Sequence, residues 1–237
     1  MNSAEKGISV VLPVYNEEDN IEYIVQSVMN FIPNMAKNYE VIVVDDGSED
    51  QSSNAIERLS CVFPRLKVIC LPRNIGYGGA LLSGFRSSKY PSVFFMDADG
   101  QFLISDLHKF VPHIDNFDII IGKRAVRHDQ LYRALVGKLY NFLICLLFKI
   151  NIKDITCGFK LIKKSVLDEL QLESTGGFIN AEMLIKALKK GYLVKEIEVR
   201  HYPRKKGKPT GASFSSFRAK VVEMLWSWHK LRHGFFV

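Results

Sequence analysis

The sequence lacks the features that would place it among several large classes of protein. Its four cysteines include no Cys-x-x-Cys pair and no histidine at ligand spacing, which argues against a disulfide framework or a structural zinc site and favours a reducing compartment. Only 8 prolines and no low-complexity segment are present, so collagen-like and linker proteins are excluded. No apolar run is as long as the roughly 20 residues that a helix needs to span a bilayer. The first residues, MNSAEKGIS, contain no apolar stretch typical of a secretion signal.

What is present is enough apolar sequence for one core and an uneven charge. The chain has 237 residues, of which 47% are apolar, which predicts one domain with appended elements. Residues 186–237 carry 13 basic and 3 acidic side chains, whereas the first 185 residues carry 19 and 22. A basic segment can attract nucleic acid, anionic lipid or a phosphorylated substrate, or can simply be a solvated surface, and composition does not choose among these.

Short apolar runs alternate with helical patterns through the first half of the chain. Strands are predicted at 7–13, 40–44, 66–71, 92–96 and 118–121, and helices at 17–31, 52–62, 78–88 and 103–113. Each strand is nearly all apolar, so helices should cover both faces of the sheet. This order predicts an α/β fold with a doubly wound, largely parallel sheet, whose ligands bind at the carboxyl ends of the strands. Further on we predict a helix at 131–149, a strand at 158–162, a helix at 180–190, a strand at 192–199 and C-terminal amphipathic helices.

Polar residues follow the first two strands. Tyr15, Asn16 and Glu17 come after Pro13, and Asn16 or Glu17 is expected to start the next helix. The adjacent carboxylates Asp45 and Asp46 repel each other, so we expect a partner such as a ribose, a cation or the following helix amides. An ordinary turn with a helix cap explains both segments equally well. A phospho-acceptor site like that of bacterial receiver domains is a rival, but those domains are about half this length.

The segment after the fourth strand carries the clearest chemical signal. Asp97, Asp99 and Gln101 stand at positions i, i+2 and i+4, so in an extended segment their oxygens share one face and can converge on one hard divalent cation. Such a cation would bridge two phosphates and stabilise a leaving diphosphate. The sequence therefore favours a functional role for these side chains over a structural one.

Basic residues that could meet phosphates come later in the chain. Arg124 follows the fifth predicted strand, and Arg204 lies in a loop that also contains Lys205, Lys206 and Lys208. Arginine suits bidentate phosphate contact, which favours Arg124 and Arg204, although each could be a solvated charge. The glycine-rich run 73–79 fails the dinucleotide fingerprint because position 81 is Leu81, so we interpret it as tight strand-to-helix packing.

Taken together, these segments resemble a family 2 glycosyltransferase with the GT-A fold, and more narrowly the dolichol-phosphate mannose synthase group and related polyprenol-phosphate sugar transferases. The resemblance covers nearly the whole chain and rests on order and spacing. The segments are SVVLPVYNEEDNI, VIVVDDGSED, FFMDADGQF, DIIIGKRA, LYNFLICLLFKINIKDITCGFKLIKKSVL and EVRHYPRKKGKPTG. The sequence departs from the mannose synthases at Gly100, where they have leucine, at Thr210, where they have lysine, and at Cys157 and Lys160 of their S-G-F-R motif.

The resemblance implies a role for each matching residue. The base and ribose of a nucleotide sugar would be held by Pro13, Tyr15, Glu17, Val44 and Asp46. The sugar and diphosphate would be lined by Asp97, Ala98 and Asp99, and Mg²⁺ or Mn²⁺ would be held by Asp97, Asp99 and Gln101. Phosphates would be contacted by Arg124, Arg204 and Lys208. Family 2 enzymes invert the anomeric centre. An acceptor phosphate needs little help from a base, whereas an acceptor hydroxyl would need a carboxylate, for which Asp154 and Glu182 are candidates.

The expected division is a glycosyltransferase domain at 1–213, with its nucleotide-sugar half ending near 124 and its acceptor half beyond, and a helix at 214–237. Aromatic and basic residues on that last helix, with the apolar stretch 139–150, favour peripheral contact with the cytoplasmic face of a membrane. Packing on the core, on a second subunit or on a membrane protein is the alternative. The first hypothesis is thus sugar transfer from a GDP-mannose or UDP-hexose type donor to a polyprenyl phosphate or other lipid-linked acceptor. Transfer to a hydroxyl and a non-catalytic scaffold are alternatives, and nucleic-acid binding is not expected.

Overall fold

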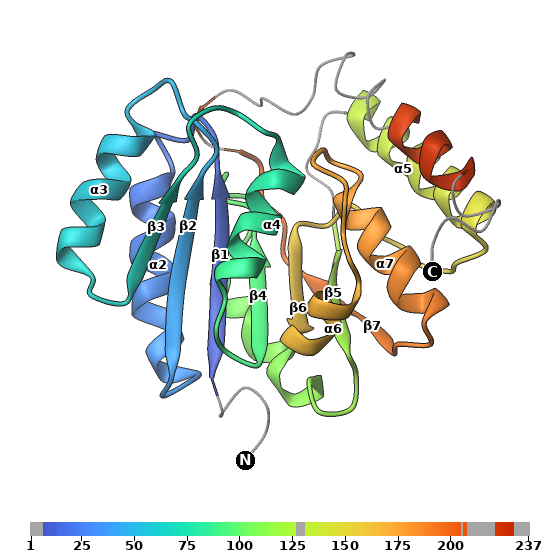
Figure 1. Ribbon diagram of the computed structural model, residues 1–237, viewed down its shortest axis with the longest axis horizontal. Coiled ribbons are helices and arrows are strands. Elements are labelled where there is room, and N and C mark those ends of the chain that lie inside the picture. The colour runs from blue at the N-terminus through green and yellow to red at the C-terminus, as the bar shows by residue number, and fades with distance from the viewer. Residues whose placement is uncertain (1–6, 127–130, 205, 208–220, 230–237) are drawn as a thin grey trace.

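A seven-stranded sheet runs through the centre of the computed structural model, which describes residues 7–126, 131–204, 206–207 and 221–229. The strands are β1 (Ile8–Val14), β2 (Tyr39–Asp45), β3 (Leu66–Cys70), β4 (Ser92–Met96), β5 (Ile119–Arg124), β6 (Phe159–Lys163) and β7 (Val194–Val199). Their order across the sheet is β3-β2-β1-β4-β6-β5-β7 (Figure 1). β6 runs antiparallel to both neighbours, and the other strand pairs are parallel. The predicted largely parallel sheet is therefore confirmed, with β4 as the central strand.

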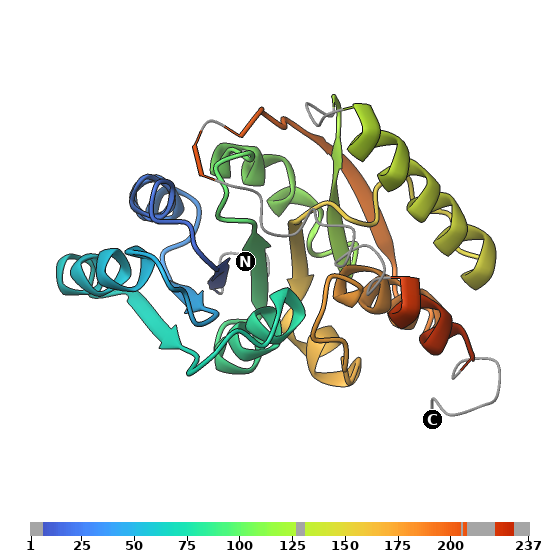
Figure 2. The ribbon, with the colours of Figure 1, turned by 90° about the horizontal axis from the view of Figure 1, so that it is seen from above.

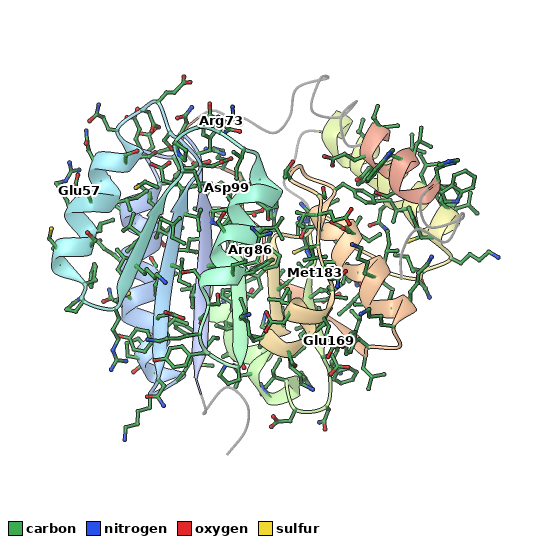
Figure 3. All side chains as sticks on the ribbon, in the orientation of Figure 1. Glu57, Arg73, Arg86, Asp99, Glu169 and Met183 are labelled. Carbon is green, nitrogen blue, oxygen red and sulfur yellow. The ribbon has the colours of Figure 1, made fainter. Side chains whose placement is uncertain are left out.

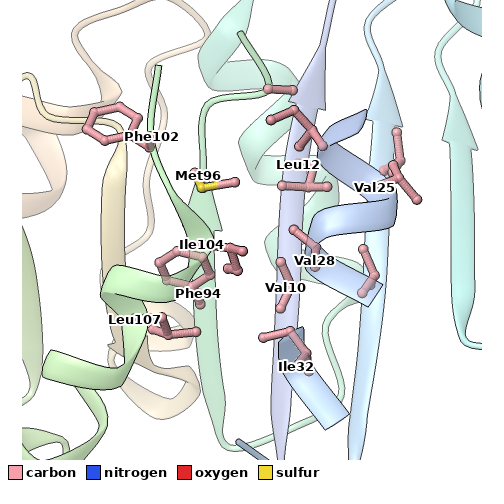
Figure 4. Close-up of a cluster of buried hydrophobic side chains, with 14 of the residues drawn as sticks. Val10, Leu12, Val25, Val28, Ile32, Phe94, Met96, Phe102, Ile104 and Leu107 are labelled. Atoms are coloured by element: carbon pink, nitrogen blue, oxygen red, sulfur yellow. The ribbon is translucent and has the colours of Figure 1, made fainter. Parts of the chain in front are cut away.

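Helices cover both faces of this sheet, as a doubly wound fold requires (Figures 1 and 2). One face packs against α2 (Ile21–Phe31), which continues into the 3₁₀ helix η1 (Ile32–Asn34), and against α3 (Ser52–Val62). The other face packs against α4 (Tyr77–Ser87), α5 (Leu131–Phe148), α6 (Lys164–Glu169) and α7 (Ile179–Lys189). Strand side chains alternate accordingly, because Val10 and Leu12 of β1 enter the first cluster and Val11 enters the second. Figure 4 shows the first cluster between β1, β4 and α2.

Two predicted helices differ from the structure. The helix predicted at 103–113 is wrong, since the chain forms two 3₁₀ helices, η2 (Ile104–Lys109) and η3 (Val111–His113). Pro112 lies in this segment and cannot donate a backbone hydrogen bond, which interrupts a continuous α-helix. The helix predicted from residue 17 begins only at Ile21. Asn16 has a positive φ of 54°, and the Glu17 amide donates to the Ser52 hydroxyl, so both residues belong to a turn.

The C-terminal part of the described chain packs beside α5 and α7. Residues 221–229 form a helix, and Met224 on it joins the same buried cluster as Tyr140 and Ile144 of α5. The predicted aromatic and basic residues Phe214, Phe217, Arg218, Lys220, Lys230, Arg232, Phe235 and Phe236 lie outside the described residues. Among the helices of the described residues, none combines the length and the apolar character that crossing a membrane would require.

Candidate active site

The carboxyl ends of the parallel strands meet at one edge of the sheet, and the predicted carboxylates gather there. Asp97 and Asp99 directly follow β4, and Figure 3 shows Asp99 at that edge. The Tyr77 hydroxyl donates a hydrogen bond of 2.7 Å to Asp97 Oδ1. The Asp97 amide donates to the Gly158 carbonyl at 3.0 Å, which anchors the backbone of this turn to the segment that precedes β6. Burial, followed by the neighbouring charge of Asp99, raises the pKa of Asp97 to about 7.

Gly158 permits a close approach to this carboxylate. A Cβ atom at position 158 would lie only 2.0 Å from Asp97 Oδ2 and 2.2 Å from its Cγ. Every other residue type carries a Cβ, so glycine is the residue that lets the Asp97 carboxylate pack against this backbone. The C-G-F-K segment therefore supports Asp97 through its glycine.

The two adjacent carboxylates after β2 turn in different directions and find separate protein donors. Asp45 accepts hydrogen bonds from the Ser48 amide at 3.0 Å, in the loop before α3, and from the Ser53 hydroxyl at the start of α3. Asp46 accepts the amides of Ile75 and Gly76 at 2.8 and 2.9 Å. Burial raises the pKa of Asp46, and these two amides partly offset that effect. The amides that bind Asp46 precede α4 and do not belong to α3, the helix that follows β2, so Asp46 fixes the start of α4.

Glu17 and Arg204, predicted from opposite ends of the chain, form an ion pair. The Arg204 guanidinium donates to Glu17 Oε2 at 2.5 Å, and the Asn20 amide donates to the same oxygen at 2.8 Å. The Glu17 side chain is 9% exposed, and burial raises its pKa although Arg204 and Asn20 partly offset the shift. The nearby charge of Asp99 also raises this pKa, so the ion pair lies within electrostatic reach of the Asp97–Asp99 turn. A Cβ at Gly100 in that turn would lie 3.5 Å from Asn20 Oδ1.

Backbone pairing brings the basic loop to this place. Gln101 and Tyr202 exchange hydrogen bonds, since the Tyr202 amide donates to the Gln101 carbonyl at 2.9 Å and the Gln101 side-chain amide donates to the Tyr202 carbonyl at 3.0 Å. Phe102 and His201 form an antiparallel bridge next to this pair. The strand-like contact between these two segments explains why residues about 100 positions apart in sequence share one site.

Arg124 and Asp154, predicted for phosphate contact and base catalysis respectively, bind each other. The guanidinium donates to both carboxylate oxygens of Asp154, at 2.8 and 2.7 Å, and also to the Thr156 hydroxyl at 2.8 Å. The exposed fractions of the Arg124 and Asp154 side chains are 11% and 4%. The positive charge of Arg124 lowers the pKa of Asp97, so the pair lies within electrostatic reach of the Asp97–Asp99 turn.

Glu182, the other predicted base, holds a loop in place. Its carboxylate accepts the amides of Glu173 and Ser174 at 2.8 to 3.1 Å and pairs with Lys186 at 2.7 Å. The loop that it fixes packs against the glycine-rich run at the start of α4, where a Cβ at Gly78 would lie 2.4 Å from the Ser174 carbonyl oxygen. The glycines of this run therefore serve close packing, as predicted, although the partner is this loop rather than a strand.

A buried lysine near Asp97 was not singled out as a site residue by the sequence. Lys160 is fully buried on β6, and its ammonium donates to Asn180 Oδ1 at 2.6 Å and to the Cys157 carbonyl. Burial lowers the pKa of Lys160 to about 8, and the negative charge of Asp97 opposes that shift. A lysine between apolar residues of a strand is the signal that could have identified it, because a buried charge requires a partner.

The remaining predicted residues flank this site or fall outside the described chain. Pro13 on β1 pairs in register with Val44 on β2, and Tyr15 follows at the end of β1. Ala98 is buried between the two carboxylates that flank it in sequence. Lys208 lies outside the described residues.

The donor set suits a divalent cation that is shared with a ligand. No cluster of three or more His, Cys, Asp or Glu side chains that could hold a metal ion occurs in the described part of the chain. Asp97 and Asp99 nevertheless offer two adjacent carboxylates with hard oxygen ligands, which fit Mg²⁺ or Mn²⁺. Further ligands would have to come from Gln101, water or a bound diphosphate.

Comparison with known proteins identifies similar sequences. The model of the family described as "Glycosyl transferase family 2" matches residues 9–171. The chain is 33% identical over 183 residues to the dolichyl-phosphate beta-glucosyltransferase of Mus musculus, a match that covers 69% of this chain and 56% of that one. It is 30% identical to the undecaprenyl-phosphate 4-deoxy-4-formamido-L-arabinose transferase of Aeromonas hydrophila, over 72% of this chain and 53% of that one. The chain thus spans about half the length of these curated relatives.

Solved structures share the fold at lower sequence identity. The glucosyl-3-phosphoglycerate synthase of Mycobacterium tuberculosis, solved with Mn²⁺, UDP and phosphoglyceric acid, superposes with a TM-score of 0.74 at 18% identity. The match covers 95% of this chain and 79% of that one. The chain therefore shares the fold of this synthase, which agrees with the predicted GT-A fold.

Proposed function

Because the chain belongs to glycosyl transferase family 2, we propose that it transfers a sugar from a nucleoside diphosphate sugar to a polyprenyl phosphate at a membrane surface. The observation that carries this proposal is that Asp97 and Asp99 lie at the carboxyl edge of the sheet, with the Glu17–Arg204 ion pair within electrostatic reach of them. These groups come from three distant segments, and together they offer carboxylates and a guanidinium to one ligand. A polyprenyl-phosphate acceptor is supported by the two relatives given above, which are a dolichyl-phosphate and an undecaprenyl-phosphate sugar transferase.

The proposed donor site uses the chain's own charges in complementary ways. Asp97 and Asp99 would hold Mg²⁺ or Mn²⁺ together with the donor diphosphate, and the cation when bound would act as a Lewis acid toward the leaving group. Arg204 would exchange its contact with Glu17 for a phosphate oxygen, since a guanidinium binds phosphate in a bidentate manner. Pro13, Tyr15, Val44 and Asp46 would line the base and ribose at the ends of β1 and β2, and transfer would invert the anomeric centre.

The state of the two candidate bases favours a phosphate acceptor. Asp154 is bound on both oxygens by Arg124, and Glu182 is bound by Lys186 and two backbone amides. A carboxylate that is bound in this way has little capacity left to remove a proton from an acceptor hydroxyl. A polyprenyl phosphate is already ionised at neutral pH, so its oxygen can attack without a base.

Exposed apolar side chains on two helices support the proposed contact with a lipid surface. On α5 they are spaced at i, i+3 and i+7 and so share one helix face. On α5 and on the helix of residues 221–229, exposed fractions are 54% for Leu139, 61% for Phe142, 62% for Leu146, 60% for Val222, 49% for Leu225 and 58% for Trp226. Side chains of this kind prefer the boundary between headgroups and acyl chains over water.

A transfer assay tests this function. The protein is incubated with Mn²⁺, polyprenyl phosphate in vesicles and a panel of radiolabelled GDP- and UDP-sugars, and label is followed into the organic phase. Label that is extracted with one donor supports the proposal and identifies the sugar. Nucleotide release that depends on a water-soluble hydroxyl acceptor, without extracted label, would replace it by the hydroxyl-transfer alternative.

A further inference from the structure

We propose that Lys160, Asn180 and Tyr77 form a hydrogen-bonded relay that positions the Asp97 carboxylate for its cation and diphosphate. The inference rests on the function proposed above, because it concerns the same site. It assigns positioning roles to three residues that line neither the base nor the phosphates in that proposal. Each of them comes from a different element, namely β6, α7 and α4.

The relay begins at a buried positive charge. The Lys160 ammonium is enclosed beneath the site, where it donates to Asn180 Oδ1 at 2.6 Å and lies 5.3 Å from the centre of the Phe95 ring. A buried ammonium is costly unless hydrogen bonds and a negative charge compensate it. The nearby negative charge of Asp97 stabilises this ammonium. The lysine and the aspartate therefore balance each other although they share no direct hydrogen bond in the relay.

The next two hydrogen bonds have a fixed direction. Because Asn180 presents its oxygen to Lys160, its side-chain nitrogen is the group left to interact with the Tyr77 hydroxyl. Burial raises the pKa of Tyr77, and the Asn180 side chain opposes that shift, as a donor to the phenol oxygen does. Tyr77 accepts there and donates its own proton to Asp97 Oδ1 at 2.7 Å. Every donor of the relay thus points from the lysine toward the carboxylate. In such an arrangement, successive hydrogen bonds polarise and strengthen one another.

The relay holds Asp97 on one side while the backbone holds it on the other. The Gly158 backbone packs so closely against the carboxylate that a Cβ would lie 2.0 Å from Oδ2. Tyr77 is itself fixed at the first position of α4, where the two amides before it bind Asp46. The carboxylate consequently has one orientation before any ligand binds, which is the requirement for a preorganised metal ligand.

Tyr77→Phe removes the last donor of the relay and keeps the ring. Binding of Mn²⁺ in the presence of UDP or GDP is measured by the loss of the free Mn²⁺ EPR signal, which requires no acceptor. We expect the Mn²⁺ dissociation constant to rise about three- to tenfold, or about 0.7–1.4 kcal/mol, which is the net contribution of a typical hydrogen bond. The matched control is Tyr140→Phe, because the buried Tyr140 hydroxyl has no hydrogen-bond partner in the described structure. This control should bind Mn²⁺ as the wild type does.

Asn180→Ala separates a relay from independent contacts. This substitution interrupts the relay between Lys160 and Tyr77, so it should also weaken Mn²⁺ binding. The double variant with Tyr77→Phe should bind Mn²⁺ no more weakly than Tyr77→Phe alone. In turnover, both variants should lower kcat and leave the KM for the lipid acceptor unchanged.

Wild-type Mn²⁺ binding in Tyr77→Phe, or fully additive effects in the double variant, would overturn the relay. A wild-type chain that binds no Mn²⁺ with either nucleotide would overturn both the metal site and the relay. Bound Mn²⁺ without any lipid product would instead overturn only the proposed acceptor.

Discussion

Substitution of Gly158 by alanine tests whether the Asp97 carboxylate must pack directly on the backbone before β6. The new Cβ would lie 2.0 Å from Oδ2 and 2.2 Å from Cγ, more than 1 Å inside the ordinary contact distance of 3.4 Å. The carboxylate must then turn away and lose its 2.7 Å hydrogen bond from Tyr77. A charge-assisted hydrogen bond of this kind contributes about 1.5–3 kcal/mol, and overpacking a buried site costs about 1–3 kcal/mol.

We therefore expect Gly158→Ala to lower the free energy of unfolding by about 2–3 kcal/mol in urea titrations. We also expect it to lower kcat/KM for sugar transfer by about 100-fold, because a displacement of about 1 Å in a reacting group has that effect. Gly191→Ala is the control, since no atom lies within 4 Å of a Cβ there, while its φ of +83° still makes alanine unfavourable. The control should lose about 1–2 kcal/mol of stability and keep wild-type turnover. Turnover within threefold of wild type in Gly158→Ala would refute the reasoning.

Three further predictions follow from the site, the exposed helix face and a buried carboxylate. Asp99→Asn should abolish sugar transfer and leave the circular dichroism spectrum unchanged, and retained turnover would contradict the metal assignment. Leu146→Glu should reduce sedimentation with anionic vesicles about tenfold or more, because burying a leucine side chain away from water contributes about 1.5–3 kcal/mol. Leu193→Glu, at a similarly exposed leucine just before β7, is the control and should have no effect. Equal losses in the two variants would refute binding through a specific helix face. Burial alone would raise the pKa of Asp106, but hydrogen bonds from Arg200 outweigh it and the pKa is lowered, so its charge stabilises the fold above the ordinary carboxyl pKa. Asp106→Asn should therefore destabilise the protein at pH 7, with a deficit in urea titrations that shrinks below about pH 4, and a deficit independent of pH would contradict this account.

The sequence predicts the sheet well because its strands are buried on both faces. β1, β2 and β4 are short apolar runs between helical patterns, and both their positions and the largely parallel sheet are confirmed. The position of β6 between β4 and β5 could not be predicted, because strand order depends on contacts between distant residues. The helix predicted at 103–113 was wrong because a helical pattern of apolar residues does not reveal that Pro112 interrupts the backbone hydrogen bonds there.

The candidate site is predictable only in part, for a similar reason. The Asp97-x-Asp99 signal needs no tertiary information, because its spacing and its place after an apolar strand suffice. The pairing of Glu17 with Arg204 joins residues 187 positions apart, and no local pattern indicates it. The sequence named Tyr77 only as part of a glycine-rich run, because its role arises from the hydrogen bond to Asp97 in the folded chain.

The central claim is tested most directly by identifying the bond that joins the transferred sugar to the acceptor in the product. Product made from a ¹³C-labelled nucleotide sugar and polyprenyl phosphate is purified and examined by NMR. The account predicts coupling between the anomeric carbon and phosphorus, together with an anomeric configuration opposite to that of the donor. An anomeric carbon without phosphorus coupling, bonded instead to the oxygen of an acceptor alcohol, would contradict it.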